Sequence, residues 1–131
     1  MRNDQDMIDN ENQRPAVWIG HVAMHSGKVA ESSEFMLSIG MRHIFSDEGI
    51  AVLEMRGGTH LVITSNPDSG LVMSSFDLMV DDIDASHREF TDLGLKPTDI
   101  ERGNIHDEFM MTEPGGTAIR FNSSHASDLP V

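Results

Sequence analysis

The feature that most constrains the fold of this 131-residue chain is an internal repeat. A shift of 54 residues places His21, Val22, Met24, Val29, Ser32 and Gly40 on Ser75, Phe76, Leu78, Ile83, Ser86 and Gly94. A shift of 58 places Gly57-Gly58-Thr59 on Gly115-Gly116-Thr117. Each half has the same order of predicted elements, namely a strand, a helix and three further strands. The repeat therefore predicts two copies of one βαβββ unit.

Apolar spacing and turn residues give the expected bounds of these elements. In the first half they predict a strand within 17–24, a helix over 28–38 that stops at Gly40, and strands over 41–46, 50–55 and 59–64. In the second half they predict a strand over 75–80, a helix from Ile83 to Gly94, and strands over 97–101, 108–112 and 117–122. We expect a flexible acidic tail over 1–15, a first module over 16–66, a linker over 67–73, a second module over 74–123 and a C-terminal tail over 124–131.

Side chains alternate between the two faces of a strand, so each predicted sheet has one apolar and one polar face. The apolar face would pack against the helix of its module. The opposite faces would carry His21, His25, His60, Thr64, Ser75, Asp77, Arg120 and Asn122. The sequence therefore predicts an α+β fold in which two tandem βαβββ modules form curved mixed sheets around a cavity for a small ligand.

Charge and composition exclude several classes of partner. Nine Lys and Arg against 22 Asp and Glu give a net charge of −13, which disfavours binding to nucleic acid or to an anionic membrane. No apolar run approaches the roughly 20 residues of a membrane-spanning helix. The chain has no cysteine, which excludes disulfides and thiolate chemistry. Its polar, acidic beginning is not typical of a secretory signal, so we expect a cytoplasmic protein.

Three motifs in this order resemble the vicinal oxygen chelate superfamily, which includes glyoxalase I, bleomycin-resistance proteins, fosfomycin-resistance enzymes and extradiol dioxygenases. The first motif joins His21-Val22 to Ser33-Glu34-Phe35-Met36 and Ile39-Gly40-Met41. The second is Val80-Asp81-Asp82-Ile83-Asp84-Ala85, and the third is Glu113-Pro114-Gly115-Gly116-Thr117-Ala118-Ile119. The resemblance covers about residues 17–123. It implies paired modules, a cavity inside the curved sheets and a homodimer.

In metalloenzymes of this superfamily, the first and last strands of each module supply one metal ligand each. The resemblance carries these positions to His21, Val62, Ser75 and Arg120. An imidazole binds metal, but an aliphatic side chain does not, a serine is a poor ligand and a guanidinium repels a cation. We therefore expect no metal site of the usual kind and no cofactor, with His21 as a relic ligand.

Two alternatives remain open around the same residues. A register slip of two positions would bring His21, His60 and Asp77 together as a divalent-metal site. Asp77 and Arg120 would otherwise form an ion pair.

The sequence favours a small-molecule-binding protein of the glyoxalase and bleomycin-resistance type. Its predicted ligand contacts are His21, His60, Asp77, Met79 and Arg120. Arg120 suggests an anionic ligand group, whereas the net charge attracts cations, so the ligand charge stays open. One alternative is a metal-dependent lyase, isomerase or dioxygenase built around His21. Another is an interaction module whose cavity is filled by its own side chains.

Overall fold

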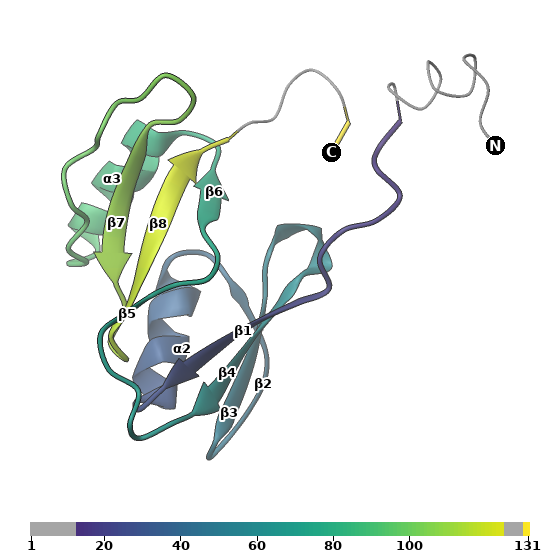
Figure 1. The fold of residues 1–131 in the computed structure, drawn as a ribbon, viewed down its shortest axis with the longest axis vertical. Coiled ribbons are helices and arrows are strands. Elements are labelled where there is room, and N and C mark those ends of the chain that lie inside the picture. Colours follow the sequence, from purple (N-terminus) through teal and green to yellow (C-terminus); the bar gives the residue numbers. More distant parts are fainter. Residues whose placement is uncertain (1–12, 125–129) are drawn as a thin grey trace.

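The computed structural model describes residues 13–124 and 130–131 and contains two βαβββ modules (Figure 1). Most of the two expected tails, 1–15 and 124–131, lies outside the described residues. The first module comprises β1 (His21–Ser26), α2 (Val29–Ser38), β2 (Arg42–Asp47), β3 (Ile50–Glu54), the short 3₁₀ turn η1 (Arg56–Gly58) and β4 (His60–Ser65). The second comprises β5 (Val72–Met73), β6 (Leu78–Val80), α3 (Ile83–Asp92), β7 (Glu108–Thr112) and β8 (Thr117–Ser123).

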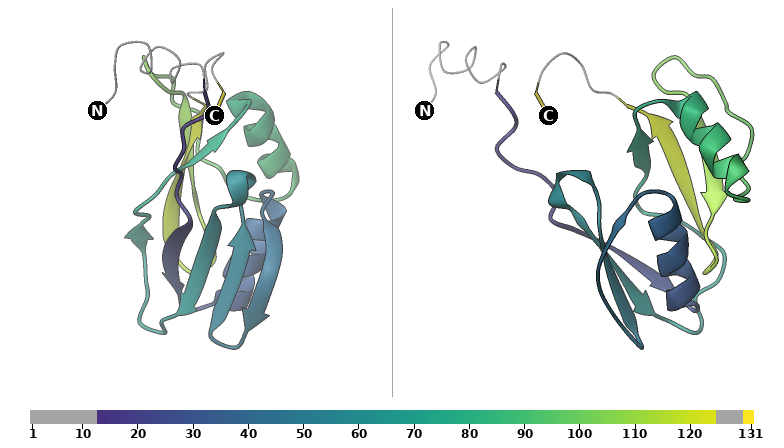
Figure 2. Two further views of the ribbon diagram at one scale, coloured as in Figure 1. Left: turned by 90° about the vertical axis from the view of Figure 1, so that its right-hand side faces the viewer. Right: turned by 180° about the vertical axis from the view of Figure 1, so that it is seen from behind.

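The strand order confirms the repeat. The first sheet has the order β1-β4-β3-β2, with β1 parallel to β4 and the other pairs antiparallel. In the second sheet, β8 pairs in parallel with β5 and β6 and antiparallel with β7. Both helices lie on the same side of the two sheets (Figure 2), so the uncovered faces of the sheets look in one common direction. No helix within the described part of the chain is long and apolar enough to cross a membrane.

The apolar faces of the strands form the core, as the alternation predicts. Leu61 and Ile63 of β4 are fully buried, and so is Met36 of α2. In the second module, Phe109 and Phe121 stack with ring centroids 5.3 Å apart. Buried side chains of both modules belong to one continuous apolar cluster. The two modules therefore share a core.

A buried polar network also joins the modules. The hydroxyls of Ser26 and Ser32 lie 2.7 Å apart, and the Ser32 hydroxyl donates to Glu113 Oε2 over 2.5 Å. The Glu113 carboxylate is 1 % exposed and also accepts the N–H groups of Gly115 and Thr117. A Cβ atom on Gly115 would lie 2.2 Å from Ser26 Oγ. The Gly-Gly turn before β8 therefore lets the second module approach the first closely.

The strand expected over 75–80 is shorter than predicted, because only β6 lies in this range. A further short strand, β5, lies within the expected linker 67–73. The Ser74 hydroxyl accepts the N–H of Phe76 over 3.1 Å. This local side-chain bond competes with the regular ladder and separates the two short strands.

The strand expected over 97–101 is also reduced. It forms a single bridge between Glu101 and Glu108. Proline 97 has no N–H to donate, and the Thr98 hydroxyl takes the N–H of Met110 over 2.8 Å. The segment therefore lies beside β7 without forming a full ladder.

Candidate functional site

The uncovered face of the first sheet carries a polar row that crosses all four strands. The register places His21 opposite His60, His60 opposite Glu54 and Glu54 opposite Arg42. The rings of His21 and His60 meet edge to face with centroids 5.7 Å apart. His60 Nε2 lies 3.1 Å from Glu54 Oε2, and Arg42 pairs with the other carboxylate oxygen. The row is therefore a connected set of imidazole, carboxylate and guanidinium groups.

The predicted contacts of the second module have other partners. Asp77 accepts a hydrogen bond from the Asn122 amide over 2.9 Å. Arg120 Nε lies 3.3 Å from Glu108 Oε2, so the alternative ion pair between Asp77 and Arg120 does not form. Met79 is 51 % exposed. The sequence could not show that Asp77 bonds to Asn122 and Arg120 to Glu108, because these contacts depend on which strand lies beside β8.

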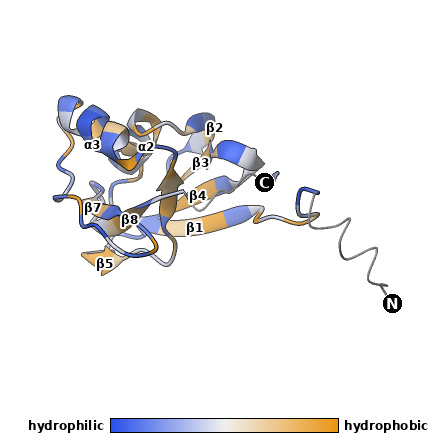
Figure 3. Ribbon diagram, turned by 90° about the horizontal axis from the view of Figure 1, so that it is seen from above, coloured by the Kyte–Doolittle hydropathy of each residue, from blue (hydrophilic) through white to orange (hydrophobic). Residues whose placement is uncertain are grey.

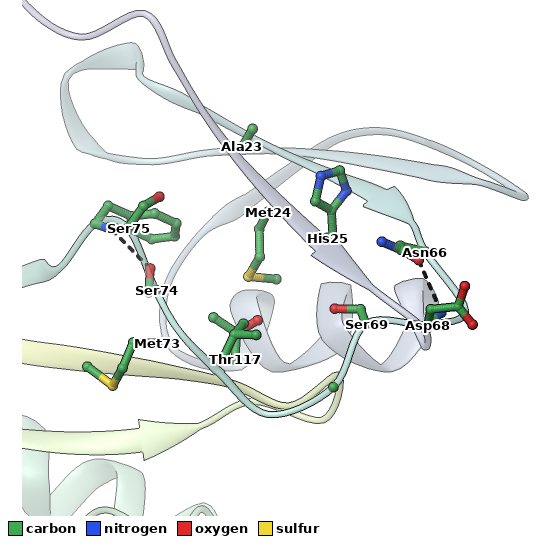
Figure 4. Close-up of a pocket in the computed structure, with 13 residues that line it drawn as sticks. Ala23, Met24, His25, Asn66, Asp68, Ser69, Met73, Ser74, Ser75 and Thr117 are labelled. Carbon is green, nitrogen blue, oxygen red and sulfur yellow. Dashed lines mark hydrogen bonds between the residues drawn. The ribbon is translucent and has the colours of Figure 1, made fainter.

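A pocket of about 400 Å³ lies between β1 and the segment 66–76 (Figure 4). In the close-up, Ala23 and His25 of β1 lie on one side of it and Met73, Ser74 and Ser75 on the other. The lining residues are Ala23, Met24, His25, Asn66, Asp68, Ser69, Gly70, Val72, Met73, Ser74, Ser75, Phe76 and Thr117. The lining contains His25 and Ser75 from the predicted polar faces but none of the five predicted ligand contacts.

Thr117 is the most informative residue of this pocket. It is 2 % exposed, and its Oγ1 is the buried side-chain oxygen that lacks a hydrogen-bond partner among the described residues. Its counterpart in the repeat, Thr59, donates its hydroxyl to the Ile19 carbonyl over 2.6 Å. A buried hydroxyl without a partner costs about 1–3 kcal/mol. Thr117 lines the pocket, but its Oγ1 is closed to solvent, so the unpaired hydroxyl lies behind the pocket wall and not on its surface.

Comparison with solved structures places this geometry among known folds. Lactoylglutathione lyase from Agrobacterium tumefaciens superposes with a TM-score of 0.71 at 13 % identity, over 84 % of this chain and 96 % of that one. A bleomycin-binding protein in complex with bleomycin gives 0.64 at 20 % identity, over 84 % and 100 %. The antibiotic-binding protein TnmS3 from a Streptomyces species gives 0.69 at 17 % identity, over 84 % and 98 %. The chain has the glyoxalase and bleomycin-resistance fold. Its sequence matches no family model and no curated protein.

Within the glyoxalase and bleomycin-resistance fold, the side chains do not fit a divalent metal. His21 and His60 are register partners, as the slipped ligand set required. Asp77 does not join them, because the described residues contain no cluster of three His, Cys, Asp or Glu side chains suited to an ion. A catalytic zinc site generally takes three protein ligands. No step of the function proposed below therefore depends on a metal.

The charges around the pocket bear on the question that the sequence left open. The pocket lining contains the carboxylate of Asp68 and the imidazole of His25, but no Lys or Arg. Arg120 is not part of the lining and is paired with Glu108. The pocket itself is therefore suited to a neutral or cationic group.

Two residues of the candidate site were missed by sequence reasoning. Glu54 lies in an apolar strand, and only the strand register shows that it faces His60. Thr117 was assigned to the start of a strand. No local signal singles it out, because Thr59 follows a Gly-Gly pair in the same way and is not buried.

Proposed function

We propose that this protein binds a neutral or cationic small molecule in the pocket between β1 and the segment 66–76, and that it holds this molecule without transforming it. The observation that carries the proposal is a pocket of about 400 Å³ whose lining combines the apolar side chains of Met24, Val72 and Phe76 with a few polar groups. Apolar walls with a few polar groups are typical of small-molecule sites. The bleomycin-binding protein and TnmS3, which share the fold, are antibiotic-binding proteins by name.

The charges of the chain and of the pocket favour a cationic or neutral ligand over an anionic one. The chain carries a net charge of −13, which raises the local concentration of cations around it. Asp68 adds a carboxylate at the pocket itself. Ser69, Ser74 and Ser75 offer hydroxyls that suit a neutral polar group equally well.

The predicted contacts extend the site beyond the pocket. His21, Ala23 and His25 alternate along β1 and lie on one face, so a ligand that leaves the pocket along this face reaches His21 and His60. Because the uncovered faces of both sheets look the same way, Asp77, Met79 and Arg120 are the corresponding candidate contacts on the second sheet. We assign these five residues to the outer parts of a large ligand.

Calorimetric titration with metal-free bleomycin tests the proposal. We expect saturable binding to the wild-type protein and about tenfold weaker binding to Asp68→Asn, which keeps the shape and removes the carboxylate of the pocket lining. Asp99→Asn is the matched control, because Asp99 is exposed and does not line the pocket. No binding of bleomycin, or equal binding by Asp68→Asn and wild type, contradicts the proposal.

A metal-dependent lyase, isomerase or dioxygenase is the second candidate, and the adjacency of His21 and His60 is the observation that favours it. Elemental analysis of protein purified without a histidine tag separates the two functions. Stoichiometric zinc, nickel, manganese or iron that disappears in His21→Ala supports the enzyme. Binding of bleomycin by metal-free protein supports the binder.

A further inference from the structure

Three methionines from three strands share one face of the second sheet. They are Met73 of β5, Met79 of β6 and Met110 of β7, here called the thioether set. Each is the register partner of a residue in β8, and these partners are Ala118, Asn122 and Arg120. The three partners alternate along β8 and point to one side of it, and residues paired across neighbouring strands point to the same side. The register therefore brings the thioether set to a single face.

This face is the one that the helix leaves uncovered. The residues of β8 that point the other way include Phe121, which packs against Phe90 of α3 with ring centroids 5.6 Å apart. Met73 and Met79 are 59 % and 51 % exposed, and Met110 is partly exposed. Figure 3 shows β5 in the hydrophobic colour at the outside of the molecule. Solvent therefore reaches the side chains of the thioether set.

Four other methionines of the described chain belong to the core instead. An exposed fraction of 9 % or less is found for Met24, Met36, Met41 and Met111. Met111 directly follows Met110, and the alternation of β7 turns the two side chains to opposite faces. Methionine is among the residues that are most often buried. Three methionines on one uncovered face therefore point to a role other than packing.

The thioether set also borders the proposed ligand site. Met73 lines the pocket, and Figure 4 shows it across the pocket from Ala23. Met79 is one of the five predicted ligand contacts, and Met110 is the register partner of another, Arg120. A thioether offers a ligand a flexible, polarisable and apolar surface. A change in the polarity of the thioether set therefore changes the surface that the ligand meets.

We infer that the thioether set is a modification site, at which hydrogen peroxide converts the exposed thioethers to sulfoxides while the fold stays intact. The sulfur lone pair forms an S–O bond as the O–O bond of the peroxide breaks, and the leaving hydroxide takes the proton of the transferred oxygen to form water. Each sulfur loses two electrons to the peroxide. Because a sulfoxide is polar, the modified face holds an apolar ligand group less tightly. This last consequence rests on the proposed function.

Peptide mass spectrometry after limited treatment with hydrogen peroxide tests the modification. We expect each member of the thioether set to be oxidised at least about tenfold faster than Met111. Met110 and Met111 are the matched pair, because they are neighbours in one strand and differ in the face that they occupy. The circular dichroism spectrum and the urea midpoint should not change. Equal oxidation of Met110 and Met111, or loss of the fold on treatment, overturns the inference.

Titration with metal-free bleomycin, after the peroxide is removed, tests the consequence for the ligand. We expect the oxidised wild-type protein to bind about tenfold more weakly than the untreated protein. A variant that combines Met73→Leu, Met79→Leu and Met110→Leu should bind equally well before and after treatment. Met55→Leu is the matched control and should stay sensitive to peroxide, because Met55 packs against the core and lies outside the thioether set.

Equal binding by treated and untreated wild-type protein overturns the effect on the ligand, and so does a loss of affinity in the treated triple variant. If the untreated protein binds no bleomycin, the proposed function fails and the effect on the ligand fails with it. The oxidation map needs no ligand, so it still decides whether the thioether set is the modification site.

Discussion

Thr59 and Thr117 occupy the same position in the two modules and differ in their surroundings. Each follows a Gly-Gly pair and precedes or begins the last strand of its module. The Thr59 hydroxyl is bonded to Ile19 O, whereas the Thr117 hydroxyl has no partner in the described structure. The same residue therefore stands at both positions of the repeat, but its hydroxyl is bonded at Thr59 and unpaired at Thr117.

This difference predicts opposite effects of one substitution on stability. Thr117→Val should raise the free energy of unfolding of the ligand-free protein by about 1 kcal/mol, because it removes an unpaired buried hydroxyl. Thr59→Val should lower it by about 1 kcal/mol, because it removes a hydrogen bond. Urea unfolding at neutral pH measures both. A loss of stability in Thr117→Val would show that its hydroxyl is already bonded in the folded protein.

At the residue scale, the sequence indicates on which face of a strand a side chain lies better than it indicates which side chain it contacts. Alternation correctly placed His21 and His60 on the uncovered face of the first sheet and Leu61 on its core face. It did not give the pairing of Glu54 with His60 or of Glu108 with Arg120. These contacts join strands whose relative register is set by packing of the whole sheet, which no local pattern contains.

At the scale of elements, the helices were the most predictable parts. α2 begins at Val29 and α3 at Ile83, which is the 54-residue shift of the repeat, and both have ten residues. Their apolar spacing and the glycines that follow them are local signals. The short strands β5 and β6 were less predictable, because their separation depends on a hydroxyl bond between Ser74 and Phe76 that only the folded chain shows.

The two ends of α3 predict opposite effects of removing an acidic side chain. Asp82 is the N-cap, and its carboxylate accepts the N–H of Ala85 over 3.0 Å. Asp82→Ala should lower the free energy of unfolding by about 1 kcal/mol. Asp92 is the last residue of the helix, near its negative end, so Asp92→Ala should raise that free energy by about 0.3–1 kcal/mol. Denaturant unfolding of both variants checks the signs, and equal signs would contradict the assignment of Asp82 as the cap.

At the scale of the whole molecule, one exposed ion pair joins the modules. Arg56 in η1 donates two hydrogen bonds to Asp81, just before α3, and these bonds hold the pKa of the Asp81 carboxyl below its usual range. A carboxyl whose pKa is lower in the folded state stabilises the fold above its unfolded pKa, about 3.9, and this contribution is lost as the pH falls through the folded pKa.

Arg56→Gln should therefore lower the urea midpoint at pH 7, and this deficit should shrink as the pH falls and Asp81 becomes protonated. The effect at pH 7 should be small, because the pair is exposed to solvent. Lys96→Gln is the control for the loss of a positive charge, since Lys96 is exposed and has no ion pair within the described residues. A deficit of Arg56→Gln that stays the same as the pH is lowered would exclude the ion pair as its cause.

The shared core leads to a prediction about how the two modules unfold. Side chains of both modules form one buried cluster, and the hydroxyl of Ser32 in the first module donates to the buried carboxylate of Glu113 in the second. Neither module can open without exposing part of the other's core. Calorimetry should therefore show one transition, with equal calorimetric and van't Hoff enthalpies.

Ser32→Ala tests the polar part of this coupling. The substitution leaves a buried carboxylate one donor short, so the free energy of unfolding should fall by about 2 kcal/mol while the single transition is kept. Ser38→Ala is the control from the same helix, because the Ser38 hydroxyl bonds only to the Phe35 carbonyl within α2. Two resolved transitions in the wild-type protein would mean that the apolar contacts between the modules are too weak to couple them. A single transition in wild type that divides in Ser32→Ala would instead assign the coupling to the Ser32–Glu113 bond alone.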